Sequence, residues 1–266
     1  MTATSAKTER LSTPFGQQLR HWRKLRGLSQ LELALKAGAS PRHVSFIETG
    51  RSRPGAALIM RLAEAMDIPP RGHNDLLLAA GLPPAWPEES LDEARMAPFR
   101  RVIDQMLARH APLPAVVFDR LWTVVQANGP AQGLLGIAPG VSALDWLVSP
   151  QVKALVENWE ELVWHAYMRL RREVAVSQDA DLEALLGRLQ AVVESLPPHV
   201  HDPVEQIEPV VCTRLRVGDQ CISTLSTIAQ FGGAREVTLH ELRLELMFPA
   251  DEASERWMME MGAMFS

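Results

Sequence analysis

The sequence predicts two parts of different fold class: a mainly α-helical N-terminal bundle of five short helices, followed by an α+β domain with an antiparallel sheet. Three observations support this division. Apolar residues recur at spacings of three and four throughout the first 80 residues. A proline-rich stretch without periodicity follows at 81–89. Beyond it, short runs typical of strands are mixed with longer amphipathic helices.

Helix caps divide the N-terminal part. Ser29 and Glu32 have the spacing of a capping box, and Ser40 followed by Pro41 has the pattern of another helix start. Gly38 ends the helix between these two caps, as a residue that tolerates the left-handed conformation. Together with the apolar spacing, these signals predict helices at about 15–26, 29–38, 40–50, 55–66 and 71–80.

The second part alternates between helical and β-type patterns. Its predicted helices cover about 91–110, 151–174, 181–195 and 251–264, and the first of them carries Phe99, Val102, Ile103 and Met106 on one side. Its predicted strands cover about 115–119, 122–127, 208–216, 220–230 and 236–248. The residues Val-Gly-Asp-Gln at 217–220 predict a hairpin turn between the third and fourth strands.

Charge is distributed unevenly between the two parts. Residues 1–85 contain 12 Lys and Arg against 6 Asp and Glu, whereas residues 86–266 contain 15 against 26. The net charge of −5 therefore combines +6 at the N-terminal end with −11 in the remainder. A basic N-terminal third is expected of a protein that meets a polyanion with that end, although ordinary variation in surface charge is the alternative.

The second and third predicted helices have the residues of a helix-turn-helix. Ala34 allows two helices to cross closely, Gly38 relieves the turn, and Val44 packs the later helix on the earlier one. Residues 28–54 (LSQLELALKAGASPRHVSFIETGRSRP) resemble the Cro/CI-type (Xre) repressor family over its whole DNA-binding unit. The resemblance implies that the later helix enters the major groove with its N-terminal residues at base edges.

The same resemblance implies a set of DNA contacts. Arg42 is the expected base reader, because a guanidinium can pair with guanine O6 and N7, while Pro41 and Phe46 offer only apolar contact. Ser40, His43 and Ser45 occupy neighbouring positions, Gln30 falls where the family anchors a phosphate, and Arg51, Arg53, Arg23 and Lys24 are candidate phosphate contacts. For two other residues a structural role is expected: an ion pair within the domain for Glu48, and the core for Trp22.

Residues 115–136 (AVVFDRLWTVVQANGPAQGLLG) resemble the opening of a PAS domain. Three segments resemble the MmyB-like transcription regulators. They are the junction from His43–Pro54 to LLLAAGLPPAW at 76–86, NWEE at 158–161, and FGGAREVTLHELRLEL at 231–246. This resemblance implies a Cro/CI-type head, a PAS-like ligand-binding and dimerisation domain, a homodimer and a fatty-acyl-type ligand. The expected boundaries are 1–11 for a flexible N-terminus, 12–82 for the DNA-binding domain, 83–110 for a linker and connecting helix, and 111–266 for the PAS-like domain.

Large side chains gather near the predicted sheet and are candidates for an apolar pocket. An arginine on a strand could meet a ligand carboxylate, and filling of an ordinary core is the alternative for each aromatic residue. The candidate ligand-binding residues are Trp122, Trp146, Trp159, Trp164, Tyr167, Met168 and Arg214.

Cysteine and histidine usage indicates neither a disulfide nor a metal centre. The hairpin turn places Arg216, not Cys212, opposite Cys221, so the two thiols are expected to stay reduced. His199 and His201 form a His-x-His pair, but zinc needs three or four protein ligands. No catalytic motif, cofactor motif, signal peptide or membrane-spanning run is present in the sequence, so a cytoplasmic protein without enzyme activity is expected.

These observations predict a sequence-specific transcription regulator that binds a double-stranded operator with an inverted repeat and senses a small ligand. The family resemblance implies that it is a repressor. The alternative is an antitoxin-like DNA-binding module that works through a protein partner and needs no small ligand.

Overall fold

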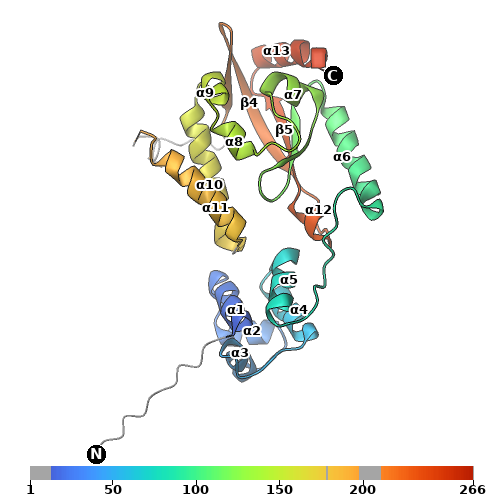
Figure 1. Cartoon of the computed structure of the whole chain (residues 1–266), viewed down its shortest axis with the longest axis vertical. Coiled ribbons are helices and arrows are strands. Elements are labelled where there is room, and N and C mark those ends of the chain that lie inside the picture. The colour runs from blue at the N-terminus through green and yellow to red at the C-terminus, as the bar shows by residue number, and fades with distance from the viewer. Residues whose placement is uncertain (1–12, 178, 198–210, 266) are drawn as a thin grey trace, which may run out of the picture. The chain divides into compact units, whose positions relative to one another are not determined.

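The computed structural model describes residues 13–177, 179–197 and 211–265. By its internal contacts the chain divides into two compact units (Figure 1). The first ends at Glu88 and also includes Arg235–Val237, and the second contains the rest of the chain from Glu89 onward. Among the helices so described, none is long and apolar enough to cross a bilayer. The expected flexible N-terminus at 1–11 lies outside the described residues.

The first unit contains the five predicted helices, close to their predicted positions. Side chains of Thr13, Ser29 and Ser40 accept hydrogen bonds from the first turns of the helices that follow them, and Ser29 and Glu32 form the complete capping box. The helices are α1 (Pro14–Leu25), α2 (Gln30–Lys36), α3 (Pro41–Glu48), α4 (Ala56–Ala65) and α5 (Pro70–Ala79).

The helix-turn-helix of this unit is held by close packing. Ala34 of α2 and Val44 of α3 are fully buried, and Gly38 between them has a φ of +61°, a conformation that glycine adopts without strain. At Gly16 of α1, an added Cβ would lie 2.6 Å from the backbone oxygen of Glu48. The backbones of α1 and α3 therefore approach more closely than any larger residue at this position would allow. Trp22 is 2% exposed, which confirms its place in the core.

The start of the predicted linker is fixed to the first unit instead of being free. The side-chain oxygen of Asn74 on α5 accepts hydrogen bonds from the backbone amides of Ala85 and Trp86, and its nitrogen donates to the Trp86 oxygen. The imidazole of His73 also packs edge-on against the Trp86 ring, and burial lowers the pKa of this histidine. Absence of periodicity in the sequence could not reveal this contact, because a buried amide on the neighbouring helix makes it.

The second unit is built on a five-stranded antiparallel sheet in the order β2-β1-β5-β4-β3. The strands are β1 (Ala115–Phe118), β2 (Val124–Ala127), β3 (Thr213–Val217), β4 (Gln220–Ala229) and β5 (Arg243–Pro249). As predicted, a hairpin joins β3 to β4, with Val217 opposite Gln220 and Arg216 opposite Cys221. Cys212 and Cys221 are free thiols. The expected strand at 208–216 begins outside the described residues.

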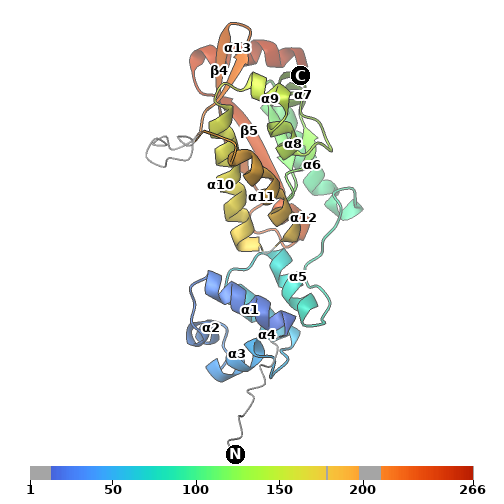
Figure 2. The same ribbon diagram turned by 60° about the vertical axis from the view of Figure 1, so that its left-hand side comes forward.

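Helices cover both faces of this sheet (Figures 1 and 2). Ala115 and Val117 of β1 point to a small core shared with α6, whereas Val116 points to a larger core shared with α10 and α11. The helices are η1 (Ala94–Met96), α6 (Ala97–His110), α7 (Gly129–Leu135), α8 (Ala143–Leu147), α9 (Pro150–Leu155), α10 (Trp159–Ser177), α11 (Ala180–Val193), α12 (Val237–Glu241), α13 (Glu252–Gly262) and η3 (Ala263–Phe265).

The predicted helix at 151–174 is interrupted at 156–158, between α9 and α10, because the chain leaves the helix at Val156 to pair with β3. Val156 has an extended backbone and bridges Leu215, and the Glu157 amide donates to the Arg214 oxygen at 2.8 Å. The side chain of Asn158 then accepts from the Arg214 amide and donates to the Cys212 oxygen. Contacts with a strand more than fifty residues away therefore override the local helical periodicity.

Two further expectations need correction. The predicted strand at 236–248 starts only at Arg243, because the preceding residues form α12 and bury Leu239 in the small core. The buried side of α6 also differs from the predicted one. Phe99 and Val102 are 38% and 43% exposed, and the buried residues are Ile103 and Leu107.

Candidate nucleic-acid interface and ligand cavity

Glu48 organises the polar interior of the first unit. Its side chain is fully buried, and its two oxygens accept hydrogen bonds from Arg23 Nε at 2.6 Å, from Arg23 Nη2 at 3.0 Å and from Gln30 Nε2 at 2.8 Å. Arg20 Nε lies 3.5 Å from the same carboxylate. The expected ion pair of Glu48 is therefore present, and it connects α1, α2 and the end of α3.

The hydrogen bonds to Glu48 set its protonation state. Burial alone would raise the pKa of Glu48, but the bonds from Arg23 and Gln30 and the charges of Arg23 and Arg20 lower it further than burial raises it. The same bond raises the pKa of Arg23. Glu48 is therefore ionised in the folded protein at neutral pH.

Acid should destabilise the first unit through Glu48. Because folding lowers the pKa of this carboxyl, its contribution to stability is present above the unfolded pKa of about 4.3 and is lost as the pH falls through the lower folded pKa. We expect urea unfolding of Glu48→Gln, followed by circular dichroism, to depend less on pH in this acidic range than that of wild type. Glu64→Gln, which alters an exposed carboxyl, should keep the wild-type dependence, and an unchanged slope for Glu48→Gln would contradict the assignment.

The outer face of α3 carries arginines and a phenyl ring. Pro41, Arg42 and Arg51 are exposed, and Phe46 is half-buried. The Cζ atoms of Arg42 and Arg51 lie 5.1 and 5.7 Å from the centre of the Phe46 ring. His43 Nε2 is 3.3 Å from Ser52 Oγ. Ser40 and Arg53 are also exposed, and His43 and Ser45 are half-buried.

Two of the expected phosphate contacts have other partners in the folded unit. The Arg23 side chain is 12% exposed, and its guanidinium is directed to Glu48 and to the Leu28 oxygen, so it is a structural residue. The Gln30 amide nitrogen is likewise bound to Glu48. Lys24 is exposed and stays a predicted contact. The sequence pattern could not show that the buried carboxylate of Glu48 would engage both side chains.

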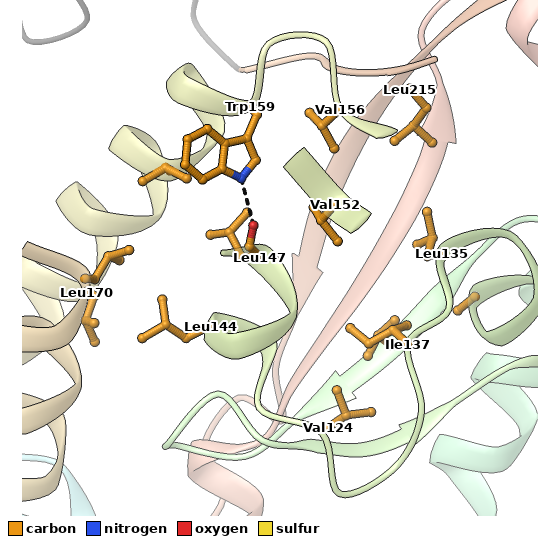
Figure 3. Close-up of a cluster of buried hydrophobic side chains, with 14 of the residues drawn as sticks. Val124, Leu135, Ile137, Leu144, Leu147, Val152, Val156, Trp159, Leu170 and Leu215 are labelled. Atoms are coloured by element: carbon orange, nitrogen blue, oxygen red, sulfur yellow. Dashed lines mark hydrogen bonds between the residues drawn. The ribbon is translucent and has the colours of Figure 1, made fainter. Parts of the chain in front are cut away.

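The second unit contains a cavity of about 670 Å³ between the sheet and the helices that cover its larger core. Apolar residues of β1, of the turn after α7 and of α8 form one wall, among them Phe118, Ile137 and Leu147. Leu135, Ile137 and Leu147 belong to the same cluster of buried side chains that Figure 3 displays. A cavity of this size is typical of small-molecule sites.

Charged side chains, among them Arg169 and Arg243, form another part of the cavity lining, and Glu173 lies beside them. Glu173 accepts hydrogen bonds from the Trp122 indole at 3.0 Å and from Arg169 Nε at 3.2 Å, and Arg243 Nη1 lies 3.2 Å from its carboxylate. The Arg169 guanidinium also lies over the Trp122 ring. Arg172 and His165 line the cavity too. Burial lowers the pKa of His165, which favours its neutral form, so the cationic groups here are arginines.

Among the predicted ligand-binding residues, Trp122, Trp146, Trp164 and Met168 line the cavity. The others lie elsewhere. Trp159 is 7% exposed in the core and donates its indole N–H to the Leu147 oxygen at 2.8 Å (Figure 3). Tyr167 stacks on Trp164 without reaching the cavity lining.

Arg214 also lies outside the lining, because β3 turns it away from its buried neighbour Leu215. Its guanidinium is 3.6 Å from Glu157 and 4.0 Å from Glu161, which explains why a strand arginine is satisfied without a ligand. The cationic strand residue of the cavity is Arg243 on β5, which the sequence analysis did not single out. The alternation Leu-Arg-Leu-Glu-Leu at 242–246 could have revealed it, since it places Arg243 on the face opposite Leu242 and Leu244.

His199 and His201 lie outside the described residues. Among the residues that are described, no three histidine, cysteine or acidic side chains gather as a metal site would require.

Models of known protein families match both units of the chain. The family model of the MmyB-like transcription regulator ligand binding domain matches residues 99–260, which is more than half of the chain. The chain belongs to the MmyB-like transcription regulators. A helix-turn-helix family model matches residues 19–72 of this regulator, which contain α2 and α3. The protein is thus a helix-turn-helix transcription regulator with an MmyB-like ligand-binding domain, which is not an enzyme family.

Two curated relatives match part of the regulator. The uncharacterized HTH-type transcriptional regulator RghRB of Bacillus subtilis (strain 168) is 42% identical over 78 residues, which are 29% of this chain and 54% of the relative. An uncharacterized HTH-type transcriptional regulator of Archaeoglobus fulgidus is 41% identical over 56 residues, 21% of this chain and 24% of the relative. The chain therefore spans about half the length of the first relative and a quarter of the second.

Among solved structures, the restriction-modification controller protein C.AhdI from Aeromonas hydrophila is 39% identical to the matched part of the regulator. The match covers 23% of this chain and 92% of that one, with a TM-score of 0.22.

Proposed function

We propose that this chain is a sequence-specific DNA-binding repressor that acts as a homodimer and senses an apolar, fatty-acyl-type molecule. The observation that carries the proposal is the cavity of about 670 Å³ in the ligand-binding domain, which combines apolar walls with arginines. We assign DNA binding to residues 12–82, the connection to 83–110, and ligand binding and dimerisation to 111–266.

The DNA-binding half of the proposal rests on α3. Its exposed N-terminal end bears Arg42, which can read a guanine, and the turn after it bears Arg51 and Arg53, which suit phosphates. Pro41, Ser40, His43 and Ser45 accompany the base-facing surface, and Lys24 adds a positive charge from α1. Gln30, at the start of α2, remains a proposed phosphate contact through its backbone or through the part of its side chain that does not bind Glu48. Arg23 is no longer a proposed contact, because its guanidinium is bound to Glu48.

Dimerisation determines the kind of operator that the regulator is expected to bind. Two copies of α3 about one DNA turn apart would read an inverted repeat. A ligand changes repression only if it binds one arrangement of the dimer better than the other. The cytoplasm, where the chromosome of a bacterium or archaeon lies, is the expected compartment.

The ligand-binding half of the proposal rests on the polarity of the cavity. Side chains such as Phe118, Ile137 and Leu147 suit an acyl chain. Near them, Nη1 of Arg243 is buried, and within the described residues it has an ion-pair contact to Glu173 but no aligned hydrogen bond. A buried donor of this kind favours an anionic head group. Arg169 and Arg172 would support the same charge.

Native mass spectrometry of the purified protein, compared with a denaturing spectrum of the same sample, tests the ligand and the dimer together. We expect a dimer that carries extra mass, and we expect denaturation to release that mass. A monomer would contradict the homodimer. A dimer that carries no extra mass and does not bind added tetradecanoate would contradict the ligand class.

The DNA interface is tested by separating base reading from phosphate binding. Selection from a pool of random duplexes first identifies a bound sequence for wild type. Arg42→Ala should then weaken binding to that duplex by roughly 1–3 kcal/mol and relax the preference at one base pair, whereas Arg51→Ala should weaken all duplexes alike. Arg61→Ala on α4, which removes a side chain bound to the Ala37 oxygen, serves as a cationic control away from α3. If the two α3-side variants bound every duplex like wild type, the reading helix would be misassigned.

A further inference from the structure

Phe46 contacts both of the arginines that the proposed DNA interface depends on. Arg42 precedes it by four residues on α3, so the two side chains are neighbours on one helix face. Arg51 comes from the turn after the helix. Both guanidinium carbons lie within 6 Å of the ring centre, at 5.1 and 5.7 Å, which is the range of cation–π attraction.

The backbone of Phe46 brings Arg51 to this position. Its carbonyl oxygen accepts hydrogen bonds from the amides of Arg51 at 2.7 Å and Ser52 at 3.2 Å. The hydroxyl of Ser52 in turn lies 3.3 Å from His43 Nε2 on α3. The turn therefore folds back on the helix, and one residue fixes it with both its carbonyl group and its ring.

The two guanidinium groups keep their capacity to bind anions. In the described part of the chain, neither Arg42 nor Arg51 forms an ion pair with a carboxylate, in contrast to Arg23. Their shared neighbour is a ring whose negative face attracts cations without neutralising them. Two long side chains that would repel each other in solution are thus held together and left available to DNA.

We propose that Phe46 is the positioning residue of the DNA interface: its ring orders the guanidinium groups of Arg42 and Arg51 as a pair before DNA binds. This inference rests on the proposed function of α3. It differs from the apolar base contact expected from the sequence, because the ring acts here through its two arginine neighbours. Base reading and phosphate binding are then coupled through one side chain.

A double-mutant cycle tests this coupling by fluorescence anisotropy, on the duplex selected by wild type. Phe46→Leu removes the ring but keeps an apolar side chain, and it should weaken binding on the order of ten-fold, because two long side chains must be ordered on binding. In an Arg51→Ala background the same change should have a clearly smaller effect. Phe46→Tyr retains the ring and should bind like wild type.

The salt dependence of binding separates positioning from a general loss of fold. Phe46→Leu should reduce the slope of log affinity against log salt by up to about one, as loss of a phosphate contact does. Circular dichroism should give wild-type helix content, because the ring is only half-buried, and Phe46→Met replaces Phe46→Leu if that variant unfolds.

The outcomes distinguish the two proposals. Wild-type protein that binds no duplex overturns both of them. If wild type binds and the arginine variants weaken it, but the effects of Phe46→Leu and Arg51→Ala simply add, the role of Phe46 is overturned and the DNA interface stands.

Discussion

Glu48→Ala should destabilise the DNA-binding unit by about 3 kcal/mol or more, because it leaves the guanidinium of Arg23 without its carboxylate in a largely buried site. The amide of Gln30 loses its acceptor at the same time. The loss should appear in urea unfolding followed by circular dichroism, as an earlier transition that accounts for the helices of the first unit.

A matched set of variants identifies the cause of this effect. Glu64→Ala removes an exposed carboxylate from α4 and should change stability by less than about 0.5 kcal/mol. The double variant Glu48→Met with Arg23→Met removes both charges and should recover a large part of the loss, because replacing a whole buried pair by apolar groups is often nearly neutral. A loss below about 1 kcal/mol for Glu48→Ala would contradict the central role of this carboxylate.

Arg243→Met should weaken the binding of tetradecanoate to the cavity by about 10-fold to 100-fold. A hydrogen bond to a charged group contributes about 1.5–3 kcal/mol, and each 1.4 kcal/mol corresponds to a factor of ten. Isothermal titration calorimetry with delipidated protein measures this change. Glu173 keeps its bonds from Trp122 and Arg169 in the variant, so its carboxylate is not left unpaired.

Two controls separate the charge of Arg243 from the shape of the cavity. Arg214→Met removes an arginine that pairs with Glu157 and Glu161 outside the lining, and it should leave affinity unchanged. Tetradecanol has the same chain without the carboxylate, so its weaker binding should not respond to Arg243→Met. If Arg214→Met and Arg243→Met acted equally on tetradecanoate, the head group would lie elsewhere.

The sequence was most informative where local physics decides the structure. The caps at Ser29 and Ser40 and the turn at Gly38 depend on neighbouring residues, so the helix-turn-helix could be placed from the printed letters. The hairpin at 217–220 is similarly local. The capture of Arg23 by Glu48, by contrast, joins positions 25 residues apart, and no local pattern indicates which of several arginines a buried carboxylate selects.

Predictions are wrong where a residue far along the chain forms hydrogen bonds with the backbone of a segment, or where packing decides which side of an element is buried. Asn158 and β3 end a helix whose periodicity continues, and Asn74 holds a proline-rich stretch that looks free. Large aromatic side chains indicate an apolar region, but their spacing cannot distinguish cavity from core: Trp122 lines the cavity, whereas Trp159 lies in the core. The orientation of Arg243 required only strand alternation, once the start of its strand was known.

The place of β5 in the sheet means that the second unit is completed much later during synthesis than the DNA-binding unit. β5 is the central strand, paired with β1 on one side and β4 on the other, yet it is synthesised after every other strand that the structure describes. The helices of the DNA-binding unit, all complete by residue 79, precede it by more than 160 residues. A nascent chain that ends before Arg243 would therefore carry a DNA-binding unit with all five of its helices beside a sheet split into two hairpins. Each of those hairpins would expose an unpaired edge to aggregation until β5 is synthesised and pairs with both.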